Sequence, residues 1–301
     1  MKPGDVEDRD DTDRRTGCGS DAVWCAEARD ISLLHALFYI HSAGNLEMLI
    51  NTIGAAQDSR VVGGTQLVCL KMAEALSSRI RYNCVVREIA QDGKTVQVRG
   101  EGFSVKGRRV IVAIPPTLAG RIRYSPLLHP MRDQLTQRMP MGITIKVQCV
   151  YPKPFWRAQG LAGQTTSDMG PVKVTFDNSP SDGHIGVLMG FIEGVDARKA
   201  VGWTAEQRRQ EVVNCLVRYF GKEAQNPLQY IEMNWAAEEF TRGCFGGYFQ
   251  TGGWLDYGPY LREPIGSLHW AGTETATVWN GYIEGALQSG ERAAQEVLAS
   301  I

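Results

Sequence analysis

The clearest pattern of apolar and polar positions lies in residues 267–301. An apolar run at 268–271 is followed by a polar, glycine-punctuated turn and then by apolar residues at steps of three and four. This spacing predicts a strand, a loop and an amphipathic helix that starts near Gly281. The apolar stripe of that helix comprises Ile283, Ala286, Leu287, Gly290, Ala294, Val297, Leu298 and Ile301. Because a helix N-terminus carries free N–H groups and a positive dipole end, the loop before it favours an anionic or electron-rich ligand.

Helical spacing also marks the first part of the chain. The apolar residues of 28–53 predict two helices with a break at 42–45, and a further helix is expected after the pair Gly63-Gly64. Short apolar runs then predict strands at 84–89, 95–99 and 109–114. The sequence QDGK is typical of a two-residue hairpin turn between the first two of these strands.

After Pro130 the pattern changes to longer strands. Residues 143–151 alternate, with apolar side chains on one face and Thr144, Lys146 and Gln148 on the other. Further elements are two strands at 172–176 and 185–192, and a helix at 204–220 with Thr204 as N-cap and Gly221 as C-cap. The aromatic, glycine-rich region 234–260 predicts a loop packed on a flat surface.

Composition and charge narrow the class of protein. A formal net charge of −1 argues against nucleic-acid binding, because phosphate contacts need a basic surface. The seven cysteines contain no C-x-x-C pair and the five histidines show no metal-ligand spacing, so no metal site is indicated. Neither a signal-peptide pattern nor an apolar stretch of the about 20 residues needed for a membrane span is found. We expect a disordered acidic tail at 1–20 and a cytoplasmic protein.

The residue identities in the C-terminal stretch are more informative than the spacing of its apolar positions. The run AGTETATVWNGYIEGALQSGERAA resembles the C-terminal flavin-binding signature of the flavin-containing amine oxidases, with monoamine oxidases as the nearest relatives. The resemblance implies an FAD cofactor, a small-molecule amine substrate and O2 as oxidant. In this family the amine α-carbon loses a hydride equivalent to the flavin, the imine is released, and O2 is reduced to H2O2; the flavin carries the hard step.

Lys146 is the first residue to which the resemblance gives a role. Alternation alone describes it as a solvent-facing lysine. The segment MGITIKVQCVYPKPFW, however, is similar to the monoamine oxidase segment whose lysine holds a water against flavin N5, and Lys146 occupies that position.

Two aromatic positions complete the catalytic set. In the family, side chains at the positions of Phe245 and Tyr282 stand on either side of the amine, and both are usually tyrosines in monoamine oxidases. Phe245 lacks the hydroxyl dipole, which affects the expected substrate preference and turnover. Trp235 matches the family tryptophan beside the flavin. As isolated aromatics all three would be ordinary core residues.

Cys244, in TRGCFGGYF, aligns with the cysteine that carries a thioether to the flavin in monoamine oxidases. Free cysteines are mostly buried and inert, and the residues around Cys244 depart from the usual wording of the family. Covalent and non-covalent attachment of FAD therefore both stay open.

The remaining assignments follow by position. The resemblance gives contacts with the cofactor to Val86, Gly272, Thr273, Glu274 and Ile283. It gives the wall of the substrate cavity to Ile50, Gln57, Val174 and Phe191, although ordinary placement explains these four almost as well. An apolar cavity suits an arylalkyl amine, and the absence of a carboxylate among the four argues mildly against a polyamine.

One part of the family pattern is missing from this sequence. Family members carry a strand, a G-x-G-x-x-G turn and a helix, which hold the pyrophosphate. Gly17-Cys18-Gly19 lacks the preceding strand and the third glycine. We expect an α/β fold, α+β in its substrate part, in which an incomplete FAD/NAD(P)-binding Rossmann-like domain is interleaved with a mixed-sheet substrate domain. Its segments are substrate-domain helices at 21–58, FAD-binding parts at 59–125 and 240–301, and a substrate domain at 126–239.

Three functions follow from this interpretation. The first is an FAD-dependent amine oxidase, or the C-terminal portion of one, that needs a complementing N-terminal segment or a homo-oligomer. The second is a truncated, catalytically silent relative that acts as a binding protein, or an incomplete gene product. The third is a related flavin desaturase acting on a C–C bond, which the lysine and the aromatic pair disfavour.

Overall fold

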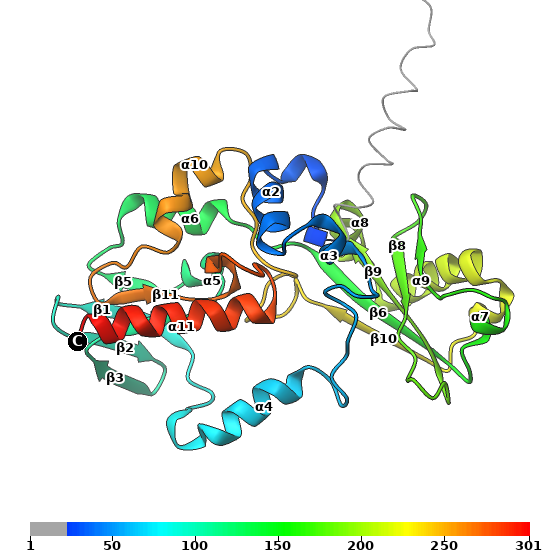
Figure 1. Cartoon of the computed structure of the whole chain (residues 1–301), viewed down its shortest axis with the longest axis horizontal. Helices are drawn as coiled ribbons and strands as arrows, with labels where there is room; N and C mark the ends of the chain where they lie inside the picture. Colours follow the sequence, from blue (N-terminus) through cyan, green and yellow to red (C-terminus); the bar gives the residue numbers. More distant parts are fainter. Residues whose placement is uncertain (1–22) are drawn as a thin grey trace, which may run out of the picture. The chain divides into compact units, whose positions relative to one another are not determined.

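The computed structural model describes residues 23–301 (Figure 1). Contacts divide them into two compact units. Unit 1 contains the described residues up to Ile31 and Met141–Tyr248, and unit 2 contains Ser32–Pro140 and Phe249–Ile301. The tail expected at 1–20 lies outside the described residues. Residues 32–58 and 126–140, predicted for the substrate domain, belong to unit 2, whereas residues 240–248, predicted for the FAD-binding domain, belong to unit 1.

Unit 1 is built on a five-stranded antiparallel sheet. Its strand order is β10 (Gln229–Asn234), β6 (Thr144–Tyr151), β9 (Gly186–Glu193), β8 (Val172–Asp177) and β7 (Thr165–Thr166). The alternation predicted for 143–151 is confirmed from Ile145 onward, since Ile145, Val147, Cys149 and Tyr151 are buried and Lys146, Gln148 and Val150 are partly exposed. The prediction was wrong for Thr144, which is buried and donates its hydroxyl to the Ile192 carbonyl at 3.2 Å. The strands predicted at 172–176 and 185–192 are also present as β8 and β9.

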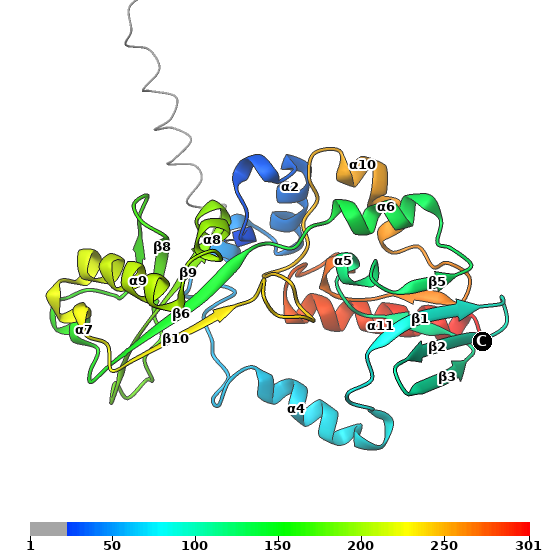
Figure 2. The same cartoon turned by 180° about the vertical axis from the view of Figure 1, so that it is seen from behind.

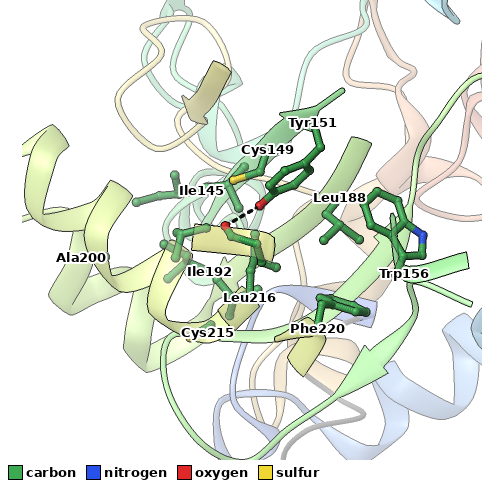
Figure 3. Close-up of a cluster of buried hydrophobic side chains, with 14 of the residues drawn as sticks. Ile145, Cys149, Tyr151, Trp156, Leu188, Ile192, Ala200, Cys215, Leu216 and Phe220 are labelled. Carbon is green, nitrogen blue, oxygen red and sulfur yellow. Dashed lines mark hydrogen bonds between the residues drawn. The ribbon is translucent and has the colours of Figure 1, made fainter. Parts of the chain in front are cut away.

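The core of unit 1 lies between one face of this sheet and α9 (Ala205–Phe220) (Figure 3). Ile145, Cys149 and Ile192 come from the sheet, while Leu216 and Phe220 come from the helix. The predicted caps are both confirmed: Thr204 and Gln207 form a reciprocal capping box, and Gly221 ends the helix with a φ of 85°. The shorter helices of unit 1 are η1 (Ala28–Asp30), α7 (Phe155–Ala158), α8 (Gly194–Ala200) and η3 (Lys222–Gln225).

Unit 2 contains two sheets, and the strands of the larger one are labelled in Figure 2. The larger has the order β3 (Phe103–Gly107), β2 (Val96–Gly100), β1 (Val86–Gln91) and β5 (Arg123–Ser125), with β1 parallel to β5. The smaller is a parallel pair of β11 (Leu268–Trp270) and β4 (Val110–Val112). The hairpin predicted at QDGK joins β1 and β2, but four residues separate the paired Gln91 and Val96, because the Asp92 carboxylate accepts from the N–H groups of Lys94 and Thr95.

The helices predicted for unit 2 are present as α2 (Leu33–Ser42), α3 (Leu46–Ile50), α4 (Gln66–Ala75) and α11 (Ile283–Ala299). Two further helices, α5 (Pro116–Ala119) and α6 (Pro130–Arg138), were not predicted. The prediction of a loop throughout 234–260 was wrong in part, because α10 (Gly253–Tyr257) forms there and η4 (Gly258–Leu261) follows it. Phe249 and Trp254 bring α10 onto the aromatic side chains of α2. Two further 3-10 turns lie in this unit, η2 (Ser77–Arg79) and η5 (Thr273–Thr275).

The helix at the end of the chain differs from its prediction in which face it buries. α11 packs against its own unit through the small residues Gly285, Ser289 and Ala293. The large members of the predicted apolar stripe are instead exposed, at 50% for Ile283, 42% for Leu287 and 70% for Leu298. Glycine at 285 is required, because a Cβ there would lie 2.1 Å from the Trp279 carbonyl oxygen. Small residues therefore allow the close approach, and the bulky stripe stays uncovered.

α4 also lacks a buried side, since none of its ten residues is buried. Val68, Leu70 and Met72 are exposed on it. An isolated helix of this length is only marginally stable in water, so α4 would gain from a covering partner.

Overall, helices and sheets are mixed as expected for the α/β class. No helix among residues 23–301 has both the length and the apolar character that crossing a bilayer requires.

Candidate functional site

Three residues predicted for the site form one row across the sheet of unit 1. Lys146 of β6 is paired with Phe191 of β9, and Phe191 is paired with Val174 of β8. Directly paired residues of antiparallel strands share a face, and this row lies on the face opposite the α9 core. The Lys146 Nζ lies 5.7 Å from the centroid of the Phe191 ring. The sheet thus presents an ammonium group beside an aromatic surface.

Phe245 joins this row from a loop. Its ring stands edge-on to Phe191, with centroids 6.0 Å apart and planes at 86°. Phe191 in turn meets Phe176 at 6.4 Å and 74°. Phe245 remains 39% exposed, which leaves part of its ring accessible for a ligand. The predicted residues Lys146, Val174, Phe191 and Phe245 are therefore brought together within unit 1.

Two glycines hold the loop of Phe245 against the start of β6. The Cys244 N–H donates to the Gly142 carbonyl at 2.9 Å, and the Gly142 N–H donates to the Gly246 carbonyl at 3.2 Å. A Cβ on Gly142 would lie 2.3 Å from the Cys244 oxygen, and one on Gly243 would lie 2.4 Å from the Met141 Cβ. Only glycine permits this backbone contact, so these positions fix where Cys244 and Phe245 lie. The Cys244–Phe245 peptide bond is cis.

The pKa values of Lys146 and Cys244 are each shifted by burial and by the other residue. Burial lowers the pKa of Lys146, and nearby Cys244 works in the opposite direction. Burial raises the pKa of Cys244 to about 12, helped by the Glu193 carboxylate and opposed by Lys146. Glu193 is buried at the end of β9 and accepts a hydrogen bond from the Cys25 Sγ at 3.3 Å. At neutral pH Cys244 is therefore a thiol, and Lys146 loses its proton more readily than a lysine in water.

Trp235 directly follows β10 in the same unit. It is half-buried, and its carbonyl accepts from the Thr241 hydroxyl at 3.1 Å, which closes the turn that leads to Cys244. This hydrogen bond connects Trp235 with the turn that precedes the loop of Phe245.

Unit 2 contains the other predicted aromatic, Tyr282. It is the N-cap residue of α11 and is half-buried against Tyr39, at a centroid distance of 6.3 Å, and Trp279, at 5.3 Å. Burial raises the pKa of Tyr282, while hydrogen bonds with Gln57 and Tyr39 lower it. Gln57, predicted for the cavity wall, therefore lies at the Tyr282 side chain. Ile50, the last residue of α3, is 50% exposed.

The predicted cofactor residues Gly272, Thr273 and Glu274 lie in the turn between β11 and α11. We call residues 272–276 the flavin loop. Gly272 has a φ of 106°, which favours glycine, and its N–H donates to the Ser289 Oγ of α11 at 3.0 Å. Ile283 begins α11, whose N-terminus has no side-chain cap. Val86 begins β1 of the same unit.

Several residues of these surroundings were not predicted from the sequence. Tyr39 contacts Tyr282, and burial and the Glu193 carboxylate raise the pKa of Cys244. Arg262, Asn280 and Arg292 donate hydrogen bonds to the flavin loop. Asn280 stands inside the recognised signature run, and that position was the one signal available for it. No group of three or more potential metal ligands occurs within residues 23–301.

Comparison with known proteins gives a family. The model of the family described as flavin containing amine oxidoreductase matches residues 9–298. The chain is 41% identical over 274 residues to a protein of Dictyostelium discoideum named "Probable flavin-containing monoamine oxidase A", covering 90% of this chain and 60% of that protein. It is 38% identical over 277 residues to the flavin-containing amine oxidase B of Sus scrofa, covering 91% and 53%. The chain thus spans little more than half the length of these relatives.

Solved structures agree with this grouping. Cyclohexylamine oxidase from Brevibacterium oxydans IH-35A superposes with a TM-score of 0.90 at 29% identity, covering 95% of this chain and 64% of that one. Wild-type putrescine oxidase bound to putrescine superposes with a TM-score of 0.90 at 32% identity, covering 98% and 66%.

Proposed function

Because the chain belongs to the flavin-containing amine oxidoreductase family, we propose that it is an FAD-dependent amine oxidase, or the C-terminal portion of one. Membership confirms the resemblance carried by the C-terminal signature, and a flavin is the family's cofactor. The proposed reaction converts a primary amine R–CH2–NH2, O2 and water into the aldehyde R–CHO, ammonia and H2O2. The carbon of the C–N bond is oxidised by two electrons and O2 is reduced by two.

The row of Lys146, Phe191 and Val174 is the observation that carries the proposal. A lysine of lowered pKa beside an aromatic ring is suited to hold a water molecule and to pass a proton near the reacting atoms. Phe245 would form one aromatic wall for the amine, and Tyr282 is proposed as the other. With an amine and the cofactor bound, these rings would exclude bulk solvent and so strengthen the electrostatic influence of the lysine.

The side chains near Lys146 favour an arylalkyl amine as the substrate. Phe176, Phe191 and Phe245 form a chain of edge-on aromatic contacts, and Val174 is buried beside them. Among the proposed wall residues only Gln57 is polar and none carries a charge. A diamine such as the putrescine bound by one structural relative would need a partner for its second ammonium group, and these four residues supply no carboxylate.

The residues of the flavin loop and the start of α11 fit a flavin. The carbonyl oxygens of residues 272–276 all accept hydrogen bonds from the protein, so the conformation of this loop is fixed before a ligand binds. Gly272, Thr273, Glu274 and Ile283 would hold the cofactor there, with Val86 and Trp235 as further contacts. When bound, the flavin supplies the two-electron acceptor. Cys244 is the proposed point of a covalent link, although burial keeps its thiol protonated at neutral pH.

A complementing polypeptide segment is part of the proposal. The exposed stripe of α11, the uncovered α4 and the parallel pair β4–β11 all belong to unit 2. Parallel sheets are normally covered on both faces and contain further strands. A segment with a strand, a glycine-rich turn and a helix would extend the pair, cover the apolar residues and hold the pyrophosphate. In this reading unit 2 is an incomplete Rossmann-like domain.

The alternative is a catalytically silent relative that acts as a binding protein. One inexpensive observation separates the two: the genomic sequence upstream of the codon for Met1, read for an in-frame or adjacent G-x-G-x-x-G unit. Finding such a unit supports the oxidase, whereas its absence from the whole locus supports the silent relative.

The direct experiment measures H2O2 release over a panel of arylalkyl amines, cycloalkyl amines and diamines, with excess FAD, with and without a complementing segment. We expect H2O2 from arylalkyl amines only when the segment is present, because the chain alone should bind FAD weakly. A stoichiometric flavin absorbance band in the chain purified alone would overturn the need for a segment. Activity confined to substrates that are not amines would overturn the amine oxidase and favour a desaturase.

A further inference from the structure

Asn280 makes an unusual set of contacts beneath the flavin loop. Its side chain is 3% exposed. The Nδ2 donates to three carbonyl oxygens of that loop, those of Thr273 at 3.0 Å, Glu274 at 3.1 Å and Ala276 at 3.1 Å. Since an amide nitrogen carries two hydrogens, at least one of them is shared between two acceptors. A single side chain therefore gathers three of the five carbonyls of the loop.

The other two carbonyls are also engaged. The Gly272 oxygen accepts from the Thr275 N–H at 2.9 Å and from its hydroxyl at 2.8 Å. The Thr275 oxygen accepts from the Arg262 Nε at 2.7 Å. All five carbonyls of residues 272–276 thus accept bonds from the protein, which fixes the direction in which every peptide of the loop points.

Asn280 is itself held in place from its backbone. Its N–H donates to the Ser42 Oγ at 3.2 Å, and the Trp279 N–H donates to the Ser42 carbonyl at 2.9 Å. Ser42 is the last residue of α2. The end of α2 therefore holds Asn280 in place, and Asn280 in turn bonds to the loop that precedes α11. Trp279 and Gly281 have φ values of 51° and 84°, and the chain turns sharply on both sides of Asn280.

We propose that Asn280 is the positioning residue of the flavin loop: its amide sets the conformation in which residues 272–276 meet the cofactor, without touching the cofactor itself. We call the three hydrogen bonds from the Asn280 Nδ2 to the loop carbonyls the clamp. The identity of the ligand rests on the proposed function, whereas the clamp rests on these contacts. Serine has one hydrogen to donate and a shorter reach. Aspartate would place a carboxylate against three carbonyl oxygens.

Hydrogen exchange of the loop amides tests the clamp without any flavin. In Asn280→Ser we expect the amides of Thr275 and Ala276 to exchange at least about tenfold faster than in the parent, since several bonds of the loop are lost. The amides of α9, in unit 1, should be unchanged. The matched control is Gln91→Glu, which removes an equivalent amide donor from the Ile265 carbonyl in the same unit. It should leave exchange in 272–276 within about twofold of the parent.

FAD titration by flavin fluorescence tests the positioning role. Asn280→Ser should weaken FAD binding by about tenfold, and Gln91→Glu should not. In Asn280→Asp, a buried carboxylate facing carbonyls has a raised pKa, so acid protonates it and restores one O–H donor. The loss of affinity in this variant, relative to the parent at the same pH, should therefore shrink as the pH falls.

The outcomes separate the clamp from the proposed function. Unchanged loop exchange in Asn280→Ser overturns the clamp, whether or not FAD binds. Faster exchange with unchanged FAD affinity overturns the positioning role. A parent chain that shows no FAD binding with or without a complementing segment counts against the proposed function, while the exchange result still tests the clamp. If Asn280→Ser does not fold, Asn280→Gln keeps the donor pair but displaces it by one methylene, and is read in the same way.

Discussion

The ring of Phe245 stands edge-on to that of Phe191, with centroids 6.0 Å apart and planes at 86°. The same Phe191 ring lies 5.7 Å from the Lys146 Nζ. One aromatic side chain of β9 therefore connects a lysine on the neighbouring strand with an aromatic residue of a loop about a hundred positions later. The predictions for unit 1 follow from this relationship.

Replacement of Lys146 by methionine should lower the rate of amine oxidation. Methionine keeps the length of the side chain but cannot hold a water or pass a proton, and we expect a loss of about 100-fold in kcat. The control is Lys153→Met, which removes an exposed lysine from the turn after β6. H2O2 release measures both variants. Equal losses in the two would show that Lys146 has no special role.

Phe245 should influence the amine more through its ring than through any polar group. Phe245→Ala removes the contact with Phe191, and kcat/KM for an arylalkyl amine should fall about tenfold. Phe245→Tyr keeps the ring and adds a hydroxyl dipole, so it should shift the order of preference within the amine panel. Phe240→Ala, at an exposed phenylalanine of the same unit, is the control. If Phe245→Ala and Phe240→Ala change kcat/KM equally, Phe245 does not form an aromatic wall for the amine.

Covalent attachment of FAD should depend on pH. The thiolate is the reactive form of a cysteine, and the pKa of Cys244 is raised to about 12 by burial and Glu193. Below that pKa the thiolate fraction grows about tenfold with each pH unit, so more flavin should stay with acid-precipitated protein after reconstitution at higher pH. Cys244→Ser should abolish this fraction, whereas Cys69→Ser, at an exposed cysteine, should not. If no flavin stays with the acid-precipitated protein at any pH of reconstitution, FAD binds non-covalently.

The stability of unit 2 should fall in mild acid because of His35. This residue is 2% exposed, accepts from the Trp254 Nε1 at 3.2 Å, and burial lowers its pKa from 6.5 to about 4. The unfolded chain therefore binds the proton first, so the stabilisation is complete above about pH 6.5 and is lost as the pH falls toward 4. Between about pH 7 and pH 5 the loss should be about 2 kcal/mol.

Urea unfolding at the two pH values measures this loss. His35→Gln keeps a neutral acceptor for Trp254. Its free energy of unfolding should therefore fall by about 2 kcal/mol less than that of the parent between about pH 7 and pH 5. If the parent and the variant lose the same stability in acid, His35 does not carry the effect.

Local rules of the sequence predicted the regular elements well. The two-residue alternation of 143–151 placed Lys146 on the face away from the core, and Thr204 formed the expected N-cap. Both depend on residues close in the chain, where spacing and hydrogen-bonding groups are visible in the sequence.

What depends on distant partners was not predictable. The stripe of α11 has helical periodicity, but periodicity does not reveal that Gly285, Ser289 and Ala293 make the close contact instead. Glu193 and Cys25 are 168 positions apart, and Asn280 could be matched to its carbonyl partners only once the loop was folded. The helix α10 was missed because its packing on α2, rather than its composition, stabilises it.

The most direct measurement of the central claim is flavin bleaching without oxygen. FAD is added to the chain with its complementing segment, an arylalkyl amine follows under anaerobic conditions, and the oxidised flavin band is recorded. We predict that the band disappears with the parent and returns on admission of O2 with one H2O2 per flavin, and that Lys146→Met slows the bleaching by about 100-fold. A bound flavin that no amine bleaches would contradict the proposal that this chain carries an amine oxidase site.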